Sequence, residues 1–461
     1  MINRILKITS LFFFAHVSII GNAQSDSTYS IIVAGHAYGA HSGTNIGLHP
    51  SFLEKLANNV DSTTKYIFLT GDIVNHSTSE SWQQVETELS EIGVNSCYVM
   101  GNHDNNSVGY EVFEQKHGGA YYSFDYRNEL FIVLNSTESD RSISSEQLNF
   151  LNEVLKAATV NNNRVFMFFH EVIWNSIEKY RLVRSNSRSR YDFIKNFSNF
   201  WEEVYPVLTA YSEKQFYLFT GDVGGNPDAI AAFYDKWENV TVLSSGMGEV
   251  ADENYLKVDI LPDTVEFTLV PLNDDVQMHP VVWYNVPEAP STIKGPDKIS
   301  PPQSGIKYQV DPVFNATGYN WNLNDGMHGQ SNSSFITVDF DASFKSGQIS
   351  VIAENDGFGE SGPAVLEIKT DDLSTVYDNK PGSGFTIRQN GAFVQVIINS
   401  DKTTKALLRI YNTNGKLLLT DELHLDPGQN IRNINKSFIQ KGAVIFDFSV
   451  NGQRFAQKAI L

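Results

Sequence analysis

The sequence predicts an α/β domain followed by two small all-β modules, and three observations lead to this prediction. Residues 28–275 alternate short apolar runs, which have no helical period, with amphipathic stretches. Residues 287–302 (PEAPSTIKGPDKISPP) are rich in proline, which is typical of a linker. Beyond residue 303 no helical period appears, and short alternating stretches indicate strands. We therefore expect a sheet covered by helices first and two β-sandwiches after it.

Length and composition limit the kinds of protein that this chain can be. Its 461 residues exceed one hydrophobic core, since a domain usually holds about 100–150 residues. A hydrophobic fraction of 41% with 19% charged residues excludes a disordered chain. The net charge of -19 excludes nucleic acid and anionic membrane as main partners, because their phosphates repel an acidic surface. The single cysteine, Cys97, excludes an intrachain disulfide and a multi-cysteine metal site.

The first 23 residues have the pattern of an export signal. Arg4 and Lys7 precede an apolar run at 11–20, and small residues stand at 21–23, where a signal peptidase would cut. The apolar run is shorter than the roughly 20 residues that a membrane span needs. We expect residues 1–23 to be removed and the protein to be secreted or held at the outer cell surface, without spanning a membrane.

The elements can be assigned in chain order. The expected strands of the first domain are 31–33, 66–69, 97–100, 130–134, 164–169, 215–219 and 240–243. The expected helices include 79–92 and 144–158, which are amphipathic. We place this domain at 28–275, a linker at 276–302, and the β-sandwiches at 303–370 and 383–461.

Five of these strands are followed directly by residues that can bind a metal ion. The five segments are Gly35-His36, Gly71-Asp72, Gly101-Asn102-His103-Asp104, His170-Glu171 and Gly221-Asp222. The carboxyl ends of strands in an open α/β sheet meet at one edge, so these side chains should lie together. Each segment alone is typical of a turn, but five in order favour a shared site. Oxygen and imidazole donors suit manganese, iron or zinc.

Longer segments around these residues resemble a known family. YIFLTGDIV at 66–74, YVMGNHD at 98–104, YYSFD at 121–125 and SSEQLNFL at 144–151 are similar to motifs of the calcineurin-like metallophosphoesterases. The resemblance covers residues 28–275. It implies a sandwich of β-sheets flanked by helices, and hydrolysis of phosphomonoesters or phosphodiesters with the help of divalent metal ions.

The sequence departs from this family at two motifs. The family's Asp-x-His is Ala34-Gly35-His36 here, and its Gly-His-x-His is Gly221-Asp222-Val223-Gly224. One metal site that the resemblance implies is complete, with the ligands Asp72, Asn102, His170 and Asp222. The other site lacks side-chain ligands at 34 and 224 and keeps only His36 besides the shared Asp72.

The charges of the complete site favour a single ion. Two carboxylates balance one divalent cation, whereas two cations would need further anionic ligands. We therefore expect one metal ion per chain, with a second site that is weak or absent and His36 beside it. His41 and His49 follow in the same loop, either as replacement ligands or as ordinary loop histidines.

The resemblance also implies catalytic roles for two residues. His103 would donate a proton to the leaving oxygen or hold the phosphate, and Asp104 would orient the His103 ring. The incomplete second site leaves two hypotheses open. The chain is either a secreted single-metal phosphoesterase or an inactive protein of the same fold that binds an anionic ligand or glycan at the cell surface.

A basic insert at 179–195 interrupts the acidic chain. Its cations are Lys179, Arg181, Arg184, Arg188, Arg190 and Lys195. They form either a lid that grips an anionic substrate or a solvated loop. The expected substrate is a phosphate ester or an anionic glycan, and the sequence does not choose between them.

The two C-terminal modules resemble non-catalytic domains of secreted bacterial proteins. Residues 303–370 are similar to PKD-like or immunoglobulin-like repeats, and we expect Trp321 in their core. Residues 383–461, with LLRIYNTNGK at 407–416 and a turn at 427–430, resemble the C-terminal sorting domain of type IX secretion. That resemblance implies the type IX secretion machinery as a partner; the alternative is an adhesion module.

Overall fold

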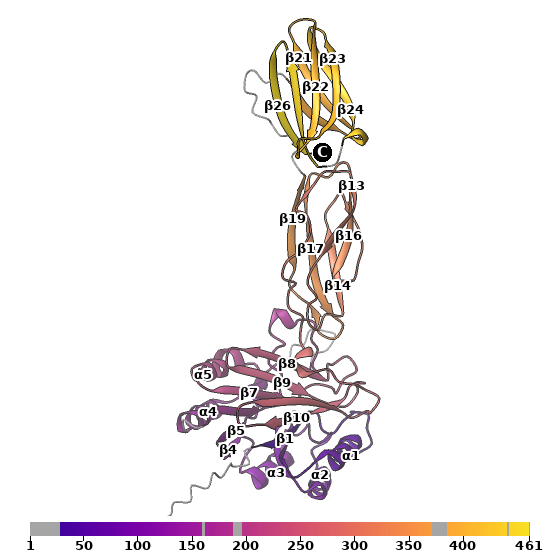
Figure 1. The fold of residues 1–461 in the computed structure, drawn as a ribbon. Coiled ribbons are helices and arrows are strands. Elements are labelled where there is room, and N and C mark those ends of the chain that lie inside the picture. Colours follow the sequence, from indigo (N-terminus) through magenta and orange to yellow (C-terminus); the bar gives the residue numbers. More distant parts are fainter. Residues whose placement is uncertain (1–27, 159–161, 188–195, 371–384, 440–441, 461) are drawn as a thin grey trace, which may run out of the picture.

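The computed structural model describes residues 28–158, 162–187, 196–370, 385–439 and 442–460 (Figure 1). The predicted export signal at 1–23 and the basic residues Arg188, Arg190 and Lys195 lie outside the described residues. Three parts follow one another along the chain. We call them the α/β domain, the first β-sandwich module and the second β-sandwich module.

The α/β domain contains two mixed sheets. The first has the order β11 (Val265–Pro271), β10 (Asn254–Ile260), β1 (Tyr29–Ala34), β2 (Thr64–Thr70) and β3 (Asn95–Val99). The second has the order β4 (Tyr122–Tyr126), β5 (Glu129–Val133), β6 (Arg164–Phe168), β7 (Gln215–Thr220), β9 (Val240–Ser245) and β8 (Ala232–Trp237). Strands β1, β2 and β3 are parallel, as are β5, β6, β7 and β9, while the remaining strands pair antiparallel at the edges.

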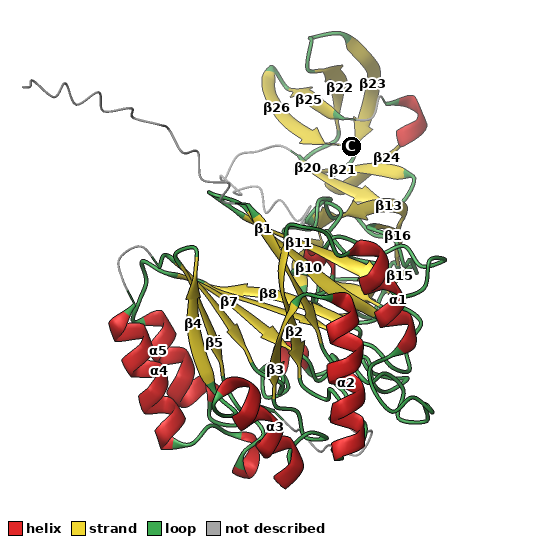
Figure 2. Cartoon of the chain, turned by 90° about the horizontal axis from the view of Figure 1, so that it is seen from below, coloured by secondary structure: helices red, strands yellow, loops and turns green. Residues whose placement is uncertain are grey.

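Helices cover the outer faces of the two sheets (Figure 2). They are α1 (Pro50–Asn59), α2 (Ser79–Ile92), α3 (Ser107–His117), α4 (Ser145–Ala157) and α5 (Tyr205–Thr209). Figure 2 shows α1, α2 and α3 beside the first sheet, and α4 and α5 beside the second. The fold class predicted from the sequence, a sandwich of sheets flanked by helices and followed by all-β modules, is confirmed.

Aromatic side chains fill the space between the sheets. Phe68 of β2 stacks on Phe168 of β6 with ring centroids 3.7 Å apart, and Phe131 of β5 lies 5.8 Å from Phe68. These rings are fully buried, so their burial and stacking are a large part of the energy that holds one sheet on the other. A second apolar cluster joins the outer face of the first sheet to the helices, where Phe52 of α1 and Trp82 of α2 are buried.

Helix α2 was predicted with its bounds, whereas α1 and α3 were not predicted. Thr78 caps α2 by accepting the N–H of Ser81, and Gly93 ends it in the left-handed conformation. Helix α3 has the same signals, an Asn106 cap and a left-handed Gly118, so these residues could have revealed it. No helix within the described ranges is both long enough and apolar enough to cross a bilayer.

Each β-sandwich module consists of two sheets. In the first module, one sheet contains β12 (Lys298–Ile299), β19 (Ala364–Thr370), β17 (Ser346–Asn355), β14 (Gly318–Leu323) and β18 (Gly359–Glu360). The sheet that faces it contains β13 (Gln303–Gln309), β16 (Phe335–Phe340) and β15 (Met327–His328). In the second module, one sheet contains β20 (Thr386–Asn390), β21 (Phe393–Ser400) and β24 (Gly428–Asn435). The sheet that faces it contains β23 (Leu417–Leu425), β22 (Thr404–Asn412), β25 (Ala443–Val450) and β26 (Gln453–Ile460). Trp321 is only partly buried, and Tyr308 is fully buried in the first module's core.

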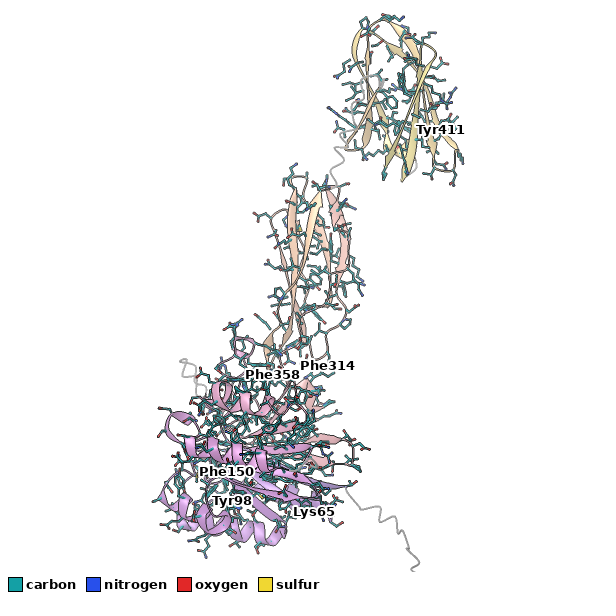
Figure 3. The ribbon with its side chains drawn as sticks, turned by 90° about the vertical axis from the view of Figure 1, so that its left-hand side faces the viewer. Lys65, Tyr98, Phe150, Phe314, Phe358 and Tyr411 are labelled. Atoms are coloured by element: carbon teal, nitrogen blue, oxygen red, sulfur yellow. The ribbon has the colours of Figure 1, made fainter. Side chains whose placement is uncertain are left out.

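The first β-sandwich module packs directly against the α/β domain (Figure 3). Phe358, in the β17–β18 turn, is 5% exposed and belongs to the core of the α/β domain, where it meets Tyr284. Phe314 contacts Trp283, and the Asn315 amide donates to the Trp283 carbonyl at 3.1 Å. Part of the predicted linker is therefore packed against the domain, because its apolar residues are buried there.

Candidate metal and phosphate site

The strand ends of both sheets meet at one edge of the α/β domain. Glycines allow this approach, since a Cβ on Gly35, after β1, would lie 2.4 Å from the Cα of Gly221, after β7. A Cβ on Gly101, after β3, would lie 2.0 Å from the backbone nitrogen of Asp72. Neither distance is possible for a real side chain, so glycine is required at these positions. The close packing brings the polar residues after five strands together.

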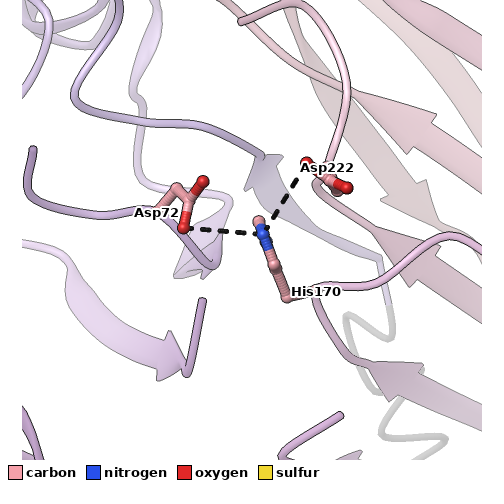
Figure 4. A group of neighbouring side chains, drawn as sticks. All are labelled: Asp72, His170 and Asp222. Atoms are coloured by element: carbon pink, nitrogen blue, oxygen red, sulfur yellow. Dashed lines mark ion pairs between the residues drawn. The ribbon is translucent and has the colours of Figure 1, made fainter. Parts of the chain in front are cut away.

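Asp72, His170 and Asp222 form the centre of this edge (Figure 4). The Nε2 atom of His170 lies 3.5 Å from Oδ1 of Asp72 and 3.9 Å from Oδ1 of Asp222. Nδ1 of His170 lies 2.9 Å from the carbonyl oxygen of Thr70, so it donates a hydrogen there. The ring is thereby held with Nε2 directed at the two carboxylates, which is the orientation that a metal ligand needs.

Asn102 completes a set of four donors. Its Oδ1 lies 3.3 Å from Nε2 of His170. The loop that carries Asn102 is tied to Asp72, because the N–H of His103 donates to Asp72 Oδ1 at 3.0 Å. Asp72 has a φ of 51°, which is left-handed and costs free energy in a non-glycine residue. The loops after β2 and β3 therefore hold their donors in a fixed arrangement.

Burial and charge shift the pKa values of this group in opposite directions. Burial alone would lower the pKa of His170, but Asp72 and Asp222 raise it to about 9. The pKa of Asp222 rises to about 7 because burial removes the carboxylate from water, despite the opposing effect of His170. Burial would also raise the pKa of Asp72, but the histidines beside it hold that pKa below its usual value. The group concentrates negative charge that a cation would neutralise.

The residues fit a divalent metal ion. Oδ2 of Asp222 is buried and has no hydrogen-bond partner among the described residues, which would be costly unless a cation satisfied it. The ligand atoms of Asp72, His170 and Asp222 all lie within 4.8 Å of one another. Two carboxylates, an imidazole and the Asn102 amide oxygen are donors that manganese, iron and zinc accept. The described part of the chain thus holds one well-formed group that could bind a metal.

The second position of the resembled family is incomplete, because positions 34 and 224 carry no ligand side chain. His36 lies near the group, with Nε2 3.8 Å from Asp72 Oδ2, and burial lowers the pKa of His36 to about 4. A Cβ on Gly225 would lie 2.3 Å from that Nε2 atom, so backbone packs against it. Gly224 has a φ of 79°, and a Cβ there would lie 2.6 Å from the carbonyl carbon of Gly246. A histidine at 224 would require the backbone to move.

His103 lines the same pocket, but the role that we expected for Asp104 is wrong. Nδ1 of His103 lies 2.8 Å from the carbonyl oxygen of Asn75, which orients the ring. The Asp104 carboxylate instead accepts backbone N–H groups of Ile73, at 3.0 Å, and Gly101, at 2.9 Å. Asp104 is fully buried beneath the two loops, because the tight turn after β3 directs its side chain inward. It braces the loops and does not touch the His103 ring.

Five polar pocket residues were not anticipated from the sequence. They are Tyr38, Arg141, Asn186, Ser187 and Asn226, which line the pocket together with His36, His41, Asp72, Asn102, His103, Asp222 and Gly225. The Tyr38 hydroxyl lies 3.5 Å from Nε2 of His103. Tyr38 could have been noticed two residues after His36, but Arg141 and Asn186 lie in loops with no recognisable pattern. His49, in contrast, caps α1 by accepting the N–H of Ser51.

The described cations of the basic insert lie outside this pocket. Lys179 pairs with Asp235 at 3.3 Å, and Arg184 pairs with Asp228 at 3.2 Å. Arg181 reaches the first β-sandwich module, where it pairs with Glu360 at 3.2 Å. These three side chains are 38–51% exposed and do not line the pocket, which agrees with a solvated loop and not with a lid over the site.

Comparisons with known proteins agree with the geometry. A family model described as calcineurin-like phosphoesterase matches residues 36–219, and one described as PKD-like domain matches residues 286–368. A Fibrobacter succinogenes protein named "Probable cyclic nucleotide phosphodiesterase" is 28% identical over 108 residues, which are 23% of this chain and 40% of that protein. The chain thus matches less than half the length of this relative.

Two solved structures show similarity to this chain at low TM-scores. The D00-D0 domain of intimin is 12% identical, with 36% of this chain and 96% of that chain covered and a TM-score of 0.16. A two-domain fibronectin type-III segment of chicken tenascin is 14% identical, with 37% and 99% covered and a TM-score of 0.15. At these scores neither structure bears on function. The two family models and the buried donor group together show that the chain carries a calcineurin-like phosphoesterase domain at residues 36–219 and a PKD-like domain at residues 286–368.

Proposed function

We propose that this chain hydrolyses phosphate esters with one divalent ion, manganese, iron or zinc, held by Asp72, Asn102, His170 and Asp222. The observation that carries the proposal is the convergence of three oxygen donors on Nε2 of His170, at 3.3–3.9 Å, beside the unpartnered Oδ2 of Asp222. His36 stands next to this group but is not one of the three residues whose ligand atoms cluster there.

The chemistry divides between the ion and the chain. A divalent ion, when bound, polarises a phosphoryl oxygen and makes a water acidic enough to attack near neutral pH. In its imidazolium form His103 can give the Nε2 proton to the leaving oxygen, because its Nδ1–H stays bound to the Asn75 carbonyl and holds the ring in place. The Tyr38 hydroxyl, 3.5 Å from that Nε2 atom, limits the rotation of the ring and lines the substrate's entry.

The substrate of this site is a phosphate ester, in free form or carried on an anionic glycan. The name of the Fibrobacter succinogenes relative supports a phosphodiester. The basic insert does not help to choose, because its described cations are paired away from the pocket. A non-hydrolytic protein that binds an anionic ligand is the second candidate, and it is favoured by the missing ligands at Ala34 and Gly224.

Metal content tests the single-ion site. We expect the full chain, purified without chelator, to hold about one transition-metal ion, because Ala34 and Gly224 supply no ligand side chain to the second position. Elemental analysis gives the count, and hydrolysis of bis(4-nitrophenyl) phosphate and 4-nitrophenyl phosphate, with and without EDTA, gives the activity.

Two other outcomes would change the proposal. Two ions per chain would mean that His36 and another group rebuild the second site. No ion, no thermal stabilisation by manganese, zinc or iron, and no EDTA-sensitive hydrolysis would favour the binding protein.

We also propose that the protein is exported to the outside of the cell or to its surface. The support is the signal-like pattern at 1–23 and the resemblance of residues 383–461 to a type IX sorting domain. We expect fractionation of the native host, with an antibody against residues 28–275, to find the protein outside the cytoplasm and shortened by the signal. Full-length protein in the cytoplasm would contradict this.

A further inference from the structure

Arg141 is the one arginine or lysine among the described residues that lines the metal pocket, whose volume is about 380 Å³. The pocket's other charged groups, Asp72 and Asp222, belong to the metal-ligand group. A phosphate ester that enters this pocket therefore meets Arg141 as the single fixed cation of the described chain.

An ion pair holds the Arg141 side chain, and the surrounding fold fixes its backbone. Its guanidinium donates through Nη1 to Glu171, whose side chain is fully buried directly after His170. Its carbonyl oxygen accepts the N–H of Ser198 at 2.8 Å. Asp140 and Arg141 both have left-handed backbones, with φ of 59° and 53°. Such strain in consecutive non-glycine residues persists only where the surroundings impose it, as at binding sites.

The held guanidinium keeps donors for a ligand. An arginine has five N–H groups, and Nη1 serves Glu171. Nε and Nη2 donate to no residue within the described ranges, and the side chain is 22% exposed at the pocket. These two atoms form one edge of the planar fork that matches two oxygens of a phosphate group.

The charges favour an ester with a single negative charge. Asp72, Asp222 and Glu171 bring three buried negative charges, which one divalent ion and Arg141 balance. Asp104 is buried too, but its carboxylate serves backbone N–H groups outside the pocket. Because the positive and negative charges of the pocket already balance, every negative charge on the substrate is left without a counter-charge. A phosphodiester, with one negative charge, therefore fits better than a phosphomonoester, with two.

We propose that Arg141 binds a non-bridging oxygen of a phosphodiester substrate through Nε and Nη2, and so supplies the positive charge that a second metal ion would bring. This inference rests on the proposed phosphoesterase function. It assigns to a protein side chain a task for which the incomplete second position lacks ligands.

Kinetics of Arg141 variants test the assignment. We expect Arg141→Ala to keep its metal ion but to lose roughly 10- to 100-fold in kcat/KM on bis(4-nitrophenyl) phosphate, mostly through KM, as expected for a lost charge-assisted hydrogen bond. Arg141→Lys should recover part of the loss, because lysine keeps the charge but not the fork. Arg181→Ala is the matched control, since Arg181 pairs with Glu360 away from the pocket. A wild-type preference for 4-nitrophenyl phosphate would overturn the phosphodiester assignment.

A double variant separates ligand binding from a structural ion pair. Arg141→Ala leaves Glu171 buried without its partner, which by itself destabilises the fold. The variant Arg141→Gln with Glu171→Gln removes both charges together and lets the two amides pair. We expect it to fold, to hold metal and to show the same rise in KM as Arg141→Ala. If its KM equals that of the wild type, the role of Arg141 is structural only and the inference is wrong.

Binding of dimethyl phosphate separates this inference from the proposed function. In zinc-loaded protein, followed by NMR titration, we expect the double variant to bind this diester roughly 10-fold more weakly than the wild type. If the wild type hydrolyses no ester but shows this difference, the proposed hydrolysis fails and Arg141 remains the anion-binding residue. Equal affinities in both proteins would overturn the inference, whether or not the wild type is an enzyme.

Discussion

Replacing Asp72 with asparagine is expected to abolish metal-dependent hydrolysis, with a loss of roughly 1,000-fold or more, because the ion's stabilisation of the reacting phosphate is lost. Asp72 Oδ1 lies 3.5 Å from His170 Nε2 and also accepts the N–H of His103. Asparagine keeps the size of the side chain and tolerates the left-handed backbone that position 72 requires. The change therefore removes the charge while the loop keeps its shape. Elemental analysis and hydrolysis with and without EDTA measure the two effects.

The matched control is Asp252→Asn, an aspartate outside the metal pocket whose pKa burial also raises. This variant should keep both metal and activity. Equal hydrolysis rates for wild type and Asp72→Asn, above the uncatalysed rate, would mean that the activity does not come from this site. Equal background rates in both would leave the non-hydrolytic binding protein as the better description.

The second large effect is expected from His103→Ala, which should lower kcat by roughly 100-fold if His103 is the general acid. The loss should be largest on esters with a poor alkyl leaving group, because such a group needs a proton to depart. It should be smaller on 4-nitrophenyl esters, whose leaving group is stable as an anion. Metal content should not change, since the backbone N–H of His103, and not its ring, contacts Asp72.

His76→Ala is the control for a nearby histidine, because His76 is exposed and does not line the pocket. Its kcat should stay close to that of the wild type on both kinds of ester. If His103→Ala loses metal as well as rate, its effect is on the site's assembly and not on proton transfer. If the loss is the same for good and poor leaving groups, His103 holds the phosphate and does not donate the proton.

Much of the first domain could be predicted because its signals are local. Apolar runs without helical period correspond to β2, β3, β5, β6, β7 and β9, and the period of 79–92 corresponds to α2. The residues that follow the strands, among them Asp72, His170 and Asp222, do meet in space. Parallel strands place His170 and Asp222 at one edge of the second sheet, as the sequence rule predicts. Asp72 follows a strand of the first sheet and joins them only because the two sheets pack together.

The prediction that Asp104 orients the His103 ring was wrong for a reason that the sequence does not reveal. Adjacency to His103 suggested contact, but neighbouring side chains in a tight turn point in different directions. Asp104 turns inward to the N–H groups of Ile73 and Gly101, while the ring of His103 finds the carbonyl of Asn75. Which partner each side chain takes depends on a loop some 30 residues away in the chain.

The sequence by itself determined the class of this protein: the order of strands and helices, the two β modules, and the types of donor that follow the strands. Only the tertiary structure decided that no side chain fits at Gly225 beside His36, that Arg141 lines the pocket, and that Phe358 of the first β-sandwich module enters the core of the α/β domain. The physical reason is the range of the interactions. Strand and helix signals repeat every few residues, whereas steric closure, buried ion pairs and packing between domains join residues that only the folded chain brings together.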